Sequence, residues 1–330
     1  MIVISDIITM PGSKASGPTK KAGNAVYLLI LLGVLGGMAV PLQTSINAEF
    51  SRFSRAVFIT SFYSFLVGTI ALFAVNLALN TEKFSASFFG AQDYSYIWFV
   101  GGLMGVVFLT ANIVLLPRIG AALTVIVTVT GQMIIGLMID TFGWFEAVPQ
   151  PFHPMHLAGV MLLIIGIIYM NINKKLAVGK QHSRAWVFLG LFTGMLPPMQ
   201  TAVNSALSRE IDSTLFAAFI SFLMGTIALF FIALIVHRRL SFNFKAGGTS
   251  LKPWHFSSGL LGALYIGMNI LLMPYLGVTL TMMSAIFGQI IMGLLIDHFG
   301  LLGLPKQPIG PRRIIAAVII VSGILILQFF

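Results

Sequence analysis

Long uncharged stretches alternate with short polar segments along most of this chain. Each stretch approaches or exceeds the roughly 20 residues that an α-helix needs to cross the hydrocarbon core of a bilayer. The longest, at 253–296, has room for two helices, and the motif PYLG at 274–277 divides it. The pattern predicts ten membrane-spanning helices at residues 25–46, 56–78, 96–116, 121–139, 157–172, 185–203, 215–236, 255–273, 279–296 and 314–330.

The composition supports this interpretation. Hydrophobic types make up 58% of the 330 residues and charged types 8%, and the mean hydropathy is +0.98. A soluble protein of this length needs far more charge to cover its surface. We therefore expect an all-α integral membrane protein that passes several times through the cell (inner) membrane. The chain has no cysteine, which excludes a disulfide framework and a thiolate metal site.

The chain repeats itself with a fixed offset. The segments SFLVGTIALF at 64–73 and SFLMGTIALF at 221–230 agree at nine of ten positions and lie 157 residues apart. The same offset relates further prolines, glycines and amide residues, with no gap between them. We therefore expect two copies of one unit, each with five helices.

Because five is odd, the second copy enters the membrane from the opposite side, and the two copies form an inverted repeat. Inverted repeats are common in secondary transporters, whose substrate site lies near the membrane midplane between the repeats. The predicted organisation is a flexible N-terminal tail at 1–24, a first repeat at 25–172, a linker at 173–184 and a second repeat at 185–330.

Basic residues gather on one side of this predicted topology. The formal net charge is +10, but Lys and Arg lie in short loops rather than in a cluster that would bind nucleic acid. The loops on one side hold 14 of them, and the other side, which includes both termini, holds 5. Because positive charge stays cytoplasmic, both termini are expected outside the cell.

Two matching motifs place amide side chains within otherwise apolar helices. They are AVPLQTSIN at 39–47 and LPPMQTAVN at 196–204, and in each the Gln and Asn are four residues apart and share a helix face. Further paired amides lie in the third and fourth helices of each repeat. Such amides either line a polar cavity between the repeats or hydrogen-bond neighbouring helices to each other. The candidate substrate-binding residues are Gln43, Thr44, Asn47, Asn112, Gln132, Gln200, Thr201, Asn204, Asn269 and Gln289.

Proline and glycine precede the amides in both motifs. Pro41 and Pro198 interrupt the helical hydrogen-bond pattern, and glycines lie one turn earlier, at Gly37 and Gly194. We expect these four residues to form hinges where the helices bend or open.

Two aspartates end the fourth helices, in the segments IDTFG and IDHFG. Asp140 and Asp297 are either titratable gates near the water boundary or caps of the turn into the next loop.

No Asp, Glu, Lys or Arg lies in the middle of any predicted helix. Intramembrane charges mark proton relays and charged-substrate sites, so this pattern weakens proton antiport through a mid-membrane carboxylate. The motifs of hydrolases, metalloproteases and phosphate-binding loops are missing as well. We therefore do not expect an enzyme, and we expect no metal and no cofactor.

The order of motifs resembles a known family. PLQTSIN, SFLVGTIALF, NIVLLPRIGAALT and GQMIIGLMIDTFG follow one another in the first copy, and close variants follow in the second. This series is similar to the YdcZ family of the drug/metabolite transporter superfamily, over about 33–172 and 190–330. The resemblance implies a ten-helix carrier with alternating access, formed here by fusion of two units that often occur singly. It implies no substrate.

The leading interpretation is a secondary transporter or exporter that moves a small neutral or zwitterionic metabolite by alternating access. A flippase for a lipid or lipid-linked headgroup is an alternative, and a membrane scaffold or sensor that transports nothing is another. The expected partners are the small-molecule substrate and bilayer lipids, with no nucleic acid. Pairing of two chains into a homodimer stays open.

Overall fold

The computed structural model of the chain describes residues 20–92, 94–147, 149, 151–171, 184–246, 249–301 and 310–329. Several side chains inside these ranges, including those of 20–25, 116–126 and 297, lie outside the description. The predicted N-terminal tail lies mostly, and the predicted linker almost wholly, outside the described residues. The first helix begins at Lys20, within the segment that was predicted to be part of the tail.

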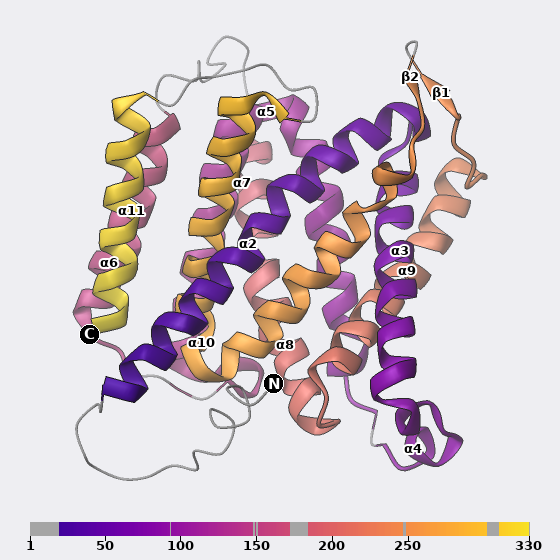
Figure 1. Cartoon of the computed structure of the whole chain (residues 1–330), viewed down its shortest axis with the longest axis horizontal. Helices are drawn as coiled ribbons and strands as arrows, with labels where there is room; N and C mark the ends of the chain where they lie inside the picture. Colours follow the sequence, from indigo (N-terminus) through magenta and orange to yellow (C-terminus); the bar gives the residue numbers. More distant parts are fainter. Residues whose placement is uncertain are drawn as a thin grey trace.

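The described chain is almost entirely helical (Figure 1), which confirms the all-α class. The first repeat contains α2 (Lys20–Ser54), α3 (Val57–Leu79), η1 (Thr81–Phe84), α4 (Ala86–Gly90), α5 (Ile97–Phe142), η2 (Trp144–Glu146) and α6 (Pro154–Asn171). The second contains α7 (Arg184–Gly194), α8 (Leu196–Glu210), α9 (Thr214–His237), β1 (Lys245–Ala246), β2 (Thr249–Ser250), η3 (Pro253–Phe256), α10 (Ser258–Phe299) and α11 (Pro311–Phe329).

Five of the described segments are long and apolar enough to cross a membrane, and three shorter apolar helices accompany them. The five are Val26–Ser54, Val57–Leu79, Ile97–Leu115, Thr214–His237 and Pro253–Ile296. Since α5 and α10 each cover two predicted helices, and α7 with α8 covers one, the count of ten stays a prediction.

Helix α10 consists of two arms joined at Gly277. This glycine has φ 71° and ψ 174°, a backbone conformation that residues with a side chain rarely adopt. Pro274 lies three residues earlier, and Figure 1 shows the ribbon of α10 descending to a sharp bend and rising again. The division that the motif PYLG predicted is therefore present, and it lies at the glycine of that motif.

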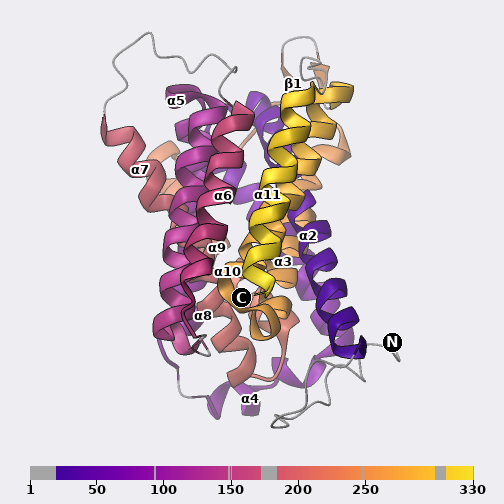
Figure 2. The same ribbon diagram turned by 90° about the vertical axis from the view of Figure 1, so that its left-hand side faces the viewer.

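The two repeats run in opposite directions. In Figure 1, α2 rises from lower left to upper right, whereas α7 and α8 descend from the top of the molecule to its lower end. Figure 2 shows the same opposition between α6, which rises to the upper end, and α11, which descends from it. The first and fifth helices are thus inverted between the repeats, as expected for units with an odd number of spans. The start of α2 and the end of α11 lie at the same, lower end of the molecule.

Contacts between equivalent residues mark the symmetry axis that relates the repeats. Thr69 on α3 and Thr226 on α9 share a hydrogen bond of 2.8 Å between their hydroxyl oxygens, and they are 157 residues apart. The rings of Phe65 and Phe222, which are separated by the same offset, lie with centroids 5.0 Å apart. A residue can contact its own counterpart only close to a two-fold axis. The pseudo-two-fold axis therefore passes between α3 and α9.

Glycines bring the backbones of the two repeats into direct contact. A Cβ atom on Gly37 of α2 would overlap the carbonyl group of Ala285 in α10, and one on Gly194 of α7 would overlap that of Thr128 in α5. The two contacts are related by the repeat offset. The first helix of each repeat therefore packs against the fourth helix of the other, so the large helix interfaces lie between the repeats.

The predicted hinges differ between the two copies. Helix α2 runs through Pro41 without a break, whereas the equivalent helix is divided into α7 and α8 between Gly194 and Leu196. The second copy has two consecutive prolines, Pro197 and Pro198, where the first has one. Prolines are tolerated in the first turn of a helix, whose N–H groups have no intrahelical partner. The double proline therefore favours a helix that starts anew, and the hinge expected at Pro41 is not a break in α2.

Candidate functional site

A buried cluster of polar side chains joins α8 to α9 in the second repeat. Gln200 Nε2 donates to Ser221 Oγ at 3.4 Å, and Asn204 Nδ2 donates to the same oxygen at 3.0 Å. All three residues are buried. In the first repeat, Gln43 Nε2 donates to Ser64 Oγ at 3.5 Å, which reproduces the first of these bonds.

Each glutamine of these clusters lies against a glycine of the opposite repeat. A Cβ atom added to Gly105 of α5 would be 2.7 Å from Nε2 of Gln200. A Cβ atom added to Gly262 of α10, the counterpart of Gly105, would be 2.5 Å from Nε2 of Gln43. The glycines therefore leave the space that the amide groups occupy. The amides lie at the boundary between the repeats, on helices that face one another.

The two asparagines of the motifs differ. Asn204 contacts Gly101, whereas the residue that corresponds to Gly101 in the second repeat is Ser258. Asn47 is 2% exposed, and neither atom of its amide has a hydrogen-bond partner among the described residues. A buried polar group without a partner costs about 1–3 kcal/mol. Asn47 therefore offers an unused donor and an unused acceptor at the repeat boundary.

The other predicted site residues divide by burial. Thr201, Gln132 and Asn269 are buried. Asn112 and Gln289 are partly exposed. Thr44 is exposed and donates to the carbonyl oxygen of Val40 on its own helix at 2.9 Å, so its side chain does not join the buried clusters.

Asp140 caps a helix of the other repeat. Its Oδ1 accepts from the backbone N–H of Val278 at 2.7 Å, and its Oδ2 accepts from that of Thr279 at 2.6 Å. These N–H groups begin the second arm of α10, directly after the break at Gly277. The turn that follows α5 ends instead on Gly143, which has φ 66°. Asp140 therefore does not cap the turn into its own loop. It caps the start of a helical arm in the other repeat, 138 residues further along the chain.

A small pocket of about 130 Å³ surrounds this contact. It is lined by Leu137, Asp140, Thr141, His156, Tyr275, Leu276, Thr279 and Leu280. The lining joins α5 and α6 of the first repeat to α10 of the second, at the lower end of the molecule. The side chain of Asp297, the counterpart of Asp140, lies outside the described residues.

A further pocket, of about 380 Å³, lies between α3, α5 and α9 at the same end. It is lined by Phe73, Phe84, Phe89, Tyr94, Trp98, Phe99, Phe219, Ile220, Leu223 and Met224. Trp98 Nε1 donates to Glu210 Oε1 at 2.9 Å. The pocket is not apparent in the sequence because its rings come from several separate elements, and the aromatic residues between 84 and 99 are the one sequence signal that points to it.

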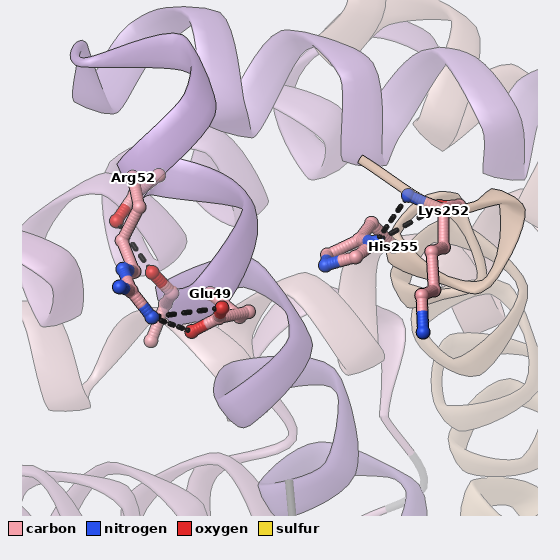
Figure 3. Close-up of polar contacts among 6 residues, drawn as sticks. Glu49, Arg52, Lys252 and His255 are labelled. Atoms are coloured by element: carbon pink, nitrogen blue, oxygen red, sulfur yellow. Dashed lines mark hydrogen bonds and ion pairs between the residues drawn. The ribbon is translucent and has the colours of Figure 1, made fainter. Parts of the chain in front are cut away.

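Local polar contacts order the connections at the upper end, where α2 ends near η3 (Figure 3). Nη1 of Arg52 donates to both carboxylate oxygens of Glu49, at 2.9 and 3.0 Å. The backbone N–H of Lys252 donates to Nδ1 of His255 at 3.0 Å. Both contacts span three residues, so they stabilise turns and do not connect the repeats.

Comparison with known proteins agrees with this two-fold organisation. The family described as "Putative inner membrane exporter, YdcZ" matches residues 28–169 and again 185–326. Both the starts and the ends of these matches are 157 residues apart, which is the offset found in the sequence.

Individual proteins are similar to this chain as well. The inner membrane protein YdcZ of Escherichia coli (strain K12) is 30% identical over 135 residues, which are 40% of this chain and 87% of that protein. One crystal structure of a protein superposes with a TM-score of 0.65 at 15% identity, covering 91% of this chain and 97% of the other, so it shows a shared fold alone. The chain thus belongs to the YdcZ family of inner membrane transport proteins, within the drug/metabolite transporter superfamily, and contains two copies of the family unit.

Proposed function

We propose that this protein is a secondary transporter that exports a small neutral or zwitterionic metabolite, and that its two repeats alternate around the buried amides. The description of the family as exporters supports the direction of transport. Among the described residues, no charged side chain hydrogen-bonds these amides, which supports an uncharged or internally balanced substrate, because a net charge would need a compensating ion.

One observation carries this proposal: the reciprocal placement of Gln43 against Gly262 and of Gln200 against Gly105. Each contact joins one repeat to the other, so relative movement of the repeats separates the amide from its glycine. The separated amide then hydrogen-bonds whatever enters the boundary. Asn47 adds a donor and an acceptor that no described residue uses.

Transport assays in sealed proteoliposomes test the proposal. The purified protein is given a panel of small metabolites, and flux is compared with that of Gln43→Leu and Gln200→Leu. Loss of one substrate hydrogen bond of about 1.5 kcal/mol reduces flux roughly tenfold. Gln92→Leu is the matched control, because Gln92 lies outside both clusters and bonds only its own helical turn, at Phe88.

Flux that is unchanged in both variants, with folded protein in each sample, would remove these amides from the route. Flux that falls equally in the Gln92 control would indicate a general loss of stability instead.

A lipid flippase is the second candidate, and the apolar pocket of about 380 Å³ favours it. Three of the lining aromatics, Phe73, Tyr94 and Phe99, are about half exposed on the outside of the bundle, where acyl chains would reach them. Leu223→Trp would fill this pocket. If the protein moves lipid, this variant loses movement of a fluorescent phospholipid between leaflets and keeps metabolite flux.

We also propose that both termini face the outside of the cell. The described basic residues at the ends of α2 and α9, and in the loop before η3, lie at the end of the molecule opposite the start of α2 and the end of α11. Reporter domains fused to each terminus test this arrangement, since a cytoplasmic C-terminus contradicts it.

A further inference from the structure

The contact of Asp140 with α10 is a junction between the repeats at a break in the helix. Asp140 is 7% exposed, and its two carboxylate oxygens accept the N–H groups of Val278 and Thr279. A Cβ atom on Gly277 would lie 3.2 and 3.3 Å from those same oxygens. The glycine therefore provides both the conformation of the break and the space for the carboxylate.

The protonation state of the carboxyl group decides whether both bonds exist. An ionised carboxylate only accepts hydrogen bonds, so each oxygen can receive one N–H. A protonated carboxyl group carries a hydrogen on one oxygen, which then donates a hydrogen bond and is a weaker acceptor for a backbone N–H than a carboxylate oxygen. Val278 and Thr279 begin a helical arm, and the first N–H groups of a helix have no intrahelical partner. Protonation thus replaces a charged acceptor by a weaker, neutral one for both N–H groups, and the one that faces the hydroxyl oxygen loses most.

Other groups at the pocket can exchange protons with this carboxyl. His156 on α6 and Tyr275 on α10 are the other titratable side chains that line it, among the described residues. The pocket of about 130 Å³ is large enough to admit water. His156 and Asp140 line the same pocket, so an imidazole and a carboxyl group share one small space between the repeats.

We propose that Asp140 is a proton-binding site that links the two repeats: ionised, it fixes the start of the second arm of α10, and protonated, it releases that arm. If the proposed transport function is correct, this release couples export to proton movement. The carboxylate would then lie near one membrane surface and not at the membrane midplane.

Hydrogen–deuterium exchange at the amides of Val278 and Thr279 tests the site without any substrate. Rates are corrected for the intrinsic effect of pH and compared between pH 8 and pH 4. Loss of a hydrogen bond to a charged acceptor is expected to accelerate exchange roughly ten- to hundredfold at low pH. Asp140→Asn keeps one acceptor oxygen and replaces the other with an NH2 group that cannot accept, so at least one of the two amides should exchange fast at both pH values.

Two controls separate this effect from general loosening. The amide of Phe216 lies in the first turn of α9 and donates to the hydroxyl of Ser213 at 3.2 Å, an acceptor that does not titrate in this range. Its corrected protection stays constant. Glu146→Gln removes an exposed carboxylate that does not line the pocket, and it should leave the pH response of Val278 and Thr279 intact.

Protection of Val278 and Thr279 that does not change between pH 8 and pH 4 in the unaltered protein overturns the site, and this measurement requires no variant. Wild-type protection in Asp140→Asn overturns it as well. Absence of flux for every metabolite would contradict the proposed function while leaving the exchange result standing. If flux does not change when a proton gradient is imposed, while hydrogen–deuterium exchange at Val278 and Thr279 depends on pH, only the coupling is refuted.

Discussion

Two glycines in the same arm of α10 should respond to alanine in opposite ways. A Cβ atom on Gly288 would overlap the carbonyl group of Val34 in α2, and the next nearest atoms are also backbone. Five residues further on, a Cβ atom on Gly293 would have nothing within 4 Å. We compare Gly288→Ala with Gly293→Ala, so the chemistry of the change and the host helix are identical.

The magnitudes follow from these surroundings. Alanine exceeds glycine in helix propensity by about 1 kcal/mol, which stabilises Gly293→Ala by up to that amount. Overpacking costs about 1–3 kcal/mol, and the cost lies at the upper end for Gly288→Ala because a backbone carbonyl cannot rotate away from the added methyl. Subtracting the propensity gain leaves a net destabilisation of about 2 kcal/mol, so the two variants should differ by about 3 kcal/mol in free energy of unfolding.

Reversible unfolding in mixed micelles measures this difference, with helix content followed by circular dichroism. If neither variant were less stable than the unaltered protein, α2 and α10 would not be in backbone contact at Gly288. Equal destabilisation would show that alanine is unfavourable throughout this arm. Either result would contradict the interface described here.

Further substitutions test the symmetry of the molecule. Thr69→Val and Thr226→Val each remove the hydrogen bond on the pseudo-two-fold axis and should cost about 0.5–1.5 kcal/mol, and the double variant should cost less than the sum, as measured by unfolding. Ser221→Ala leaves two buried amide donors without their acceptor and should cost about 1–3 kcal/mol, clearly more than Ser64→Ala, whose hydroxyl receives one long bond. Arg52→Ala removes an exposed ion pair and should change the free energy of unfolding by less than about 1 kcal/mol, and a larger loss would contradict the local role of that contact.

Much of the fold follows from the hydrophobic pattern and the repeat. The break in α10 is an example, because PYLG contains the proline that precedes it and the glycine that forms it. The division of the first helix in the second repeat was only partly predictable. Pro41 and Pro198 are equivalent in sequence, but one lies within a continuous helix and the other starts a new one, since Pro197 removes a second donor.

The candidate site was predicted in composition and not in its contacts. The sequence identified Gln43 and Gln200 as amides in apolar helices, and it left open whether they face a cavity or neighbouring helices. It could not identify Gly105 and Gly262 as the surfaces that receive them, because these glycines lie far away in the chain and resemble many others. The sequence could not show that Asp140 accepts from Val278 and Thr279, because these residues also lie far away in the chain.

Local chemistry and periodicity settled the membrane class, the helical state and the duplication, because each depends on which residues lie within a few turns of one another. Only the three-dimensional packing decided that the first helix of each repeat contacts the fourth helix of the other. The same is true of Asp140, which caps the start of a helical arm in the other repeat. Such contacts depend on how two bundles fit together. A glycine in the sequence permits a close approach, but the sequence does not show which backbone segment packs against it.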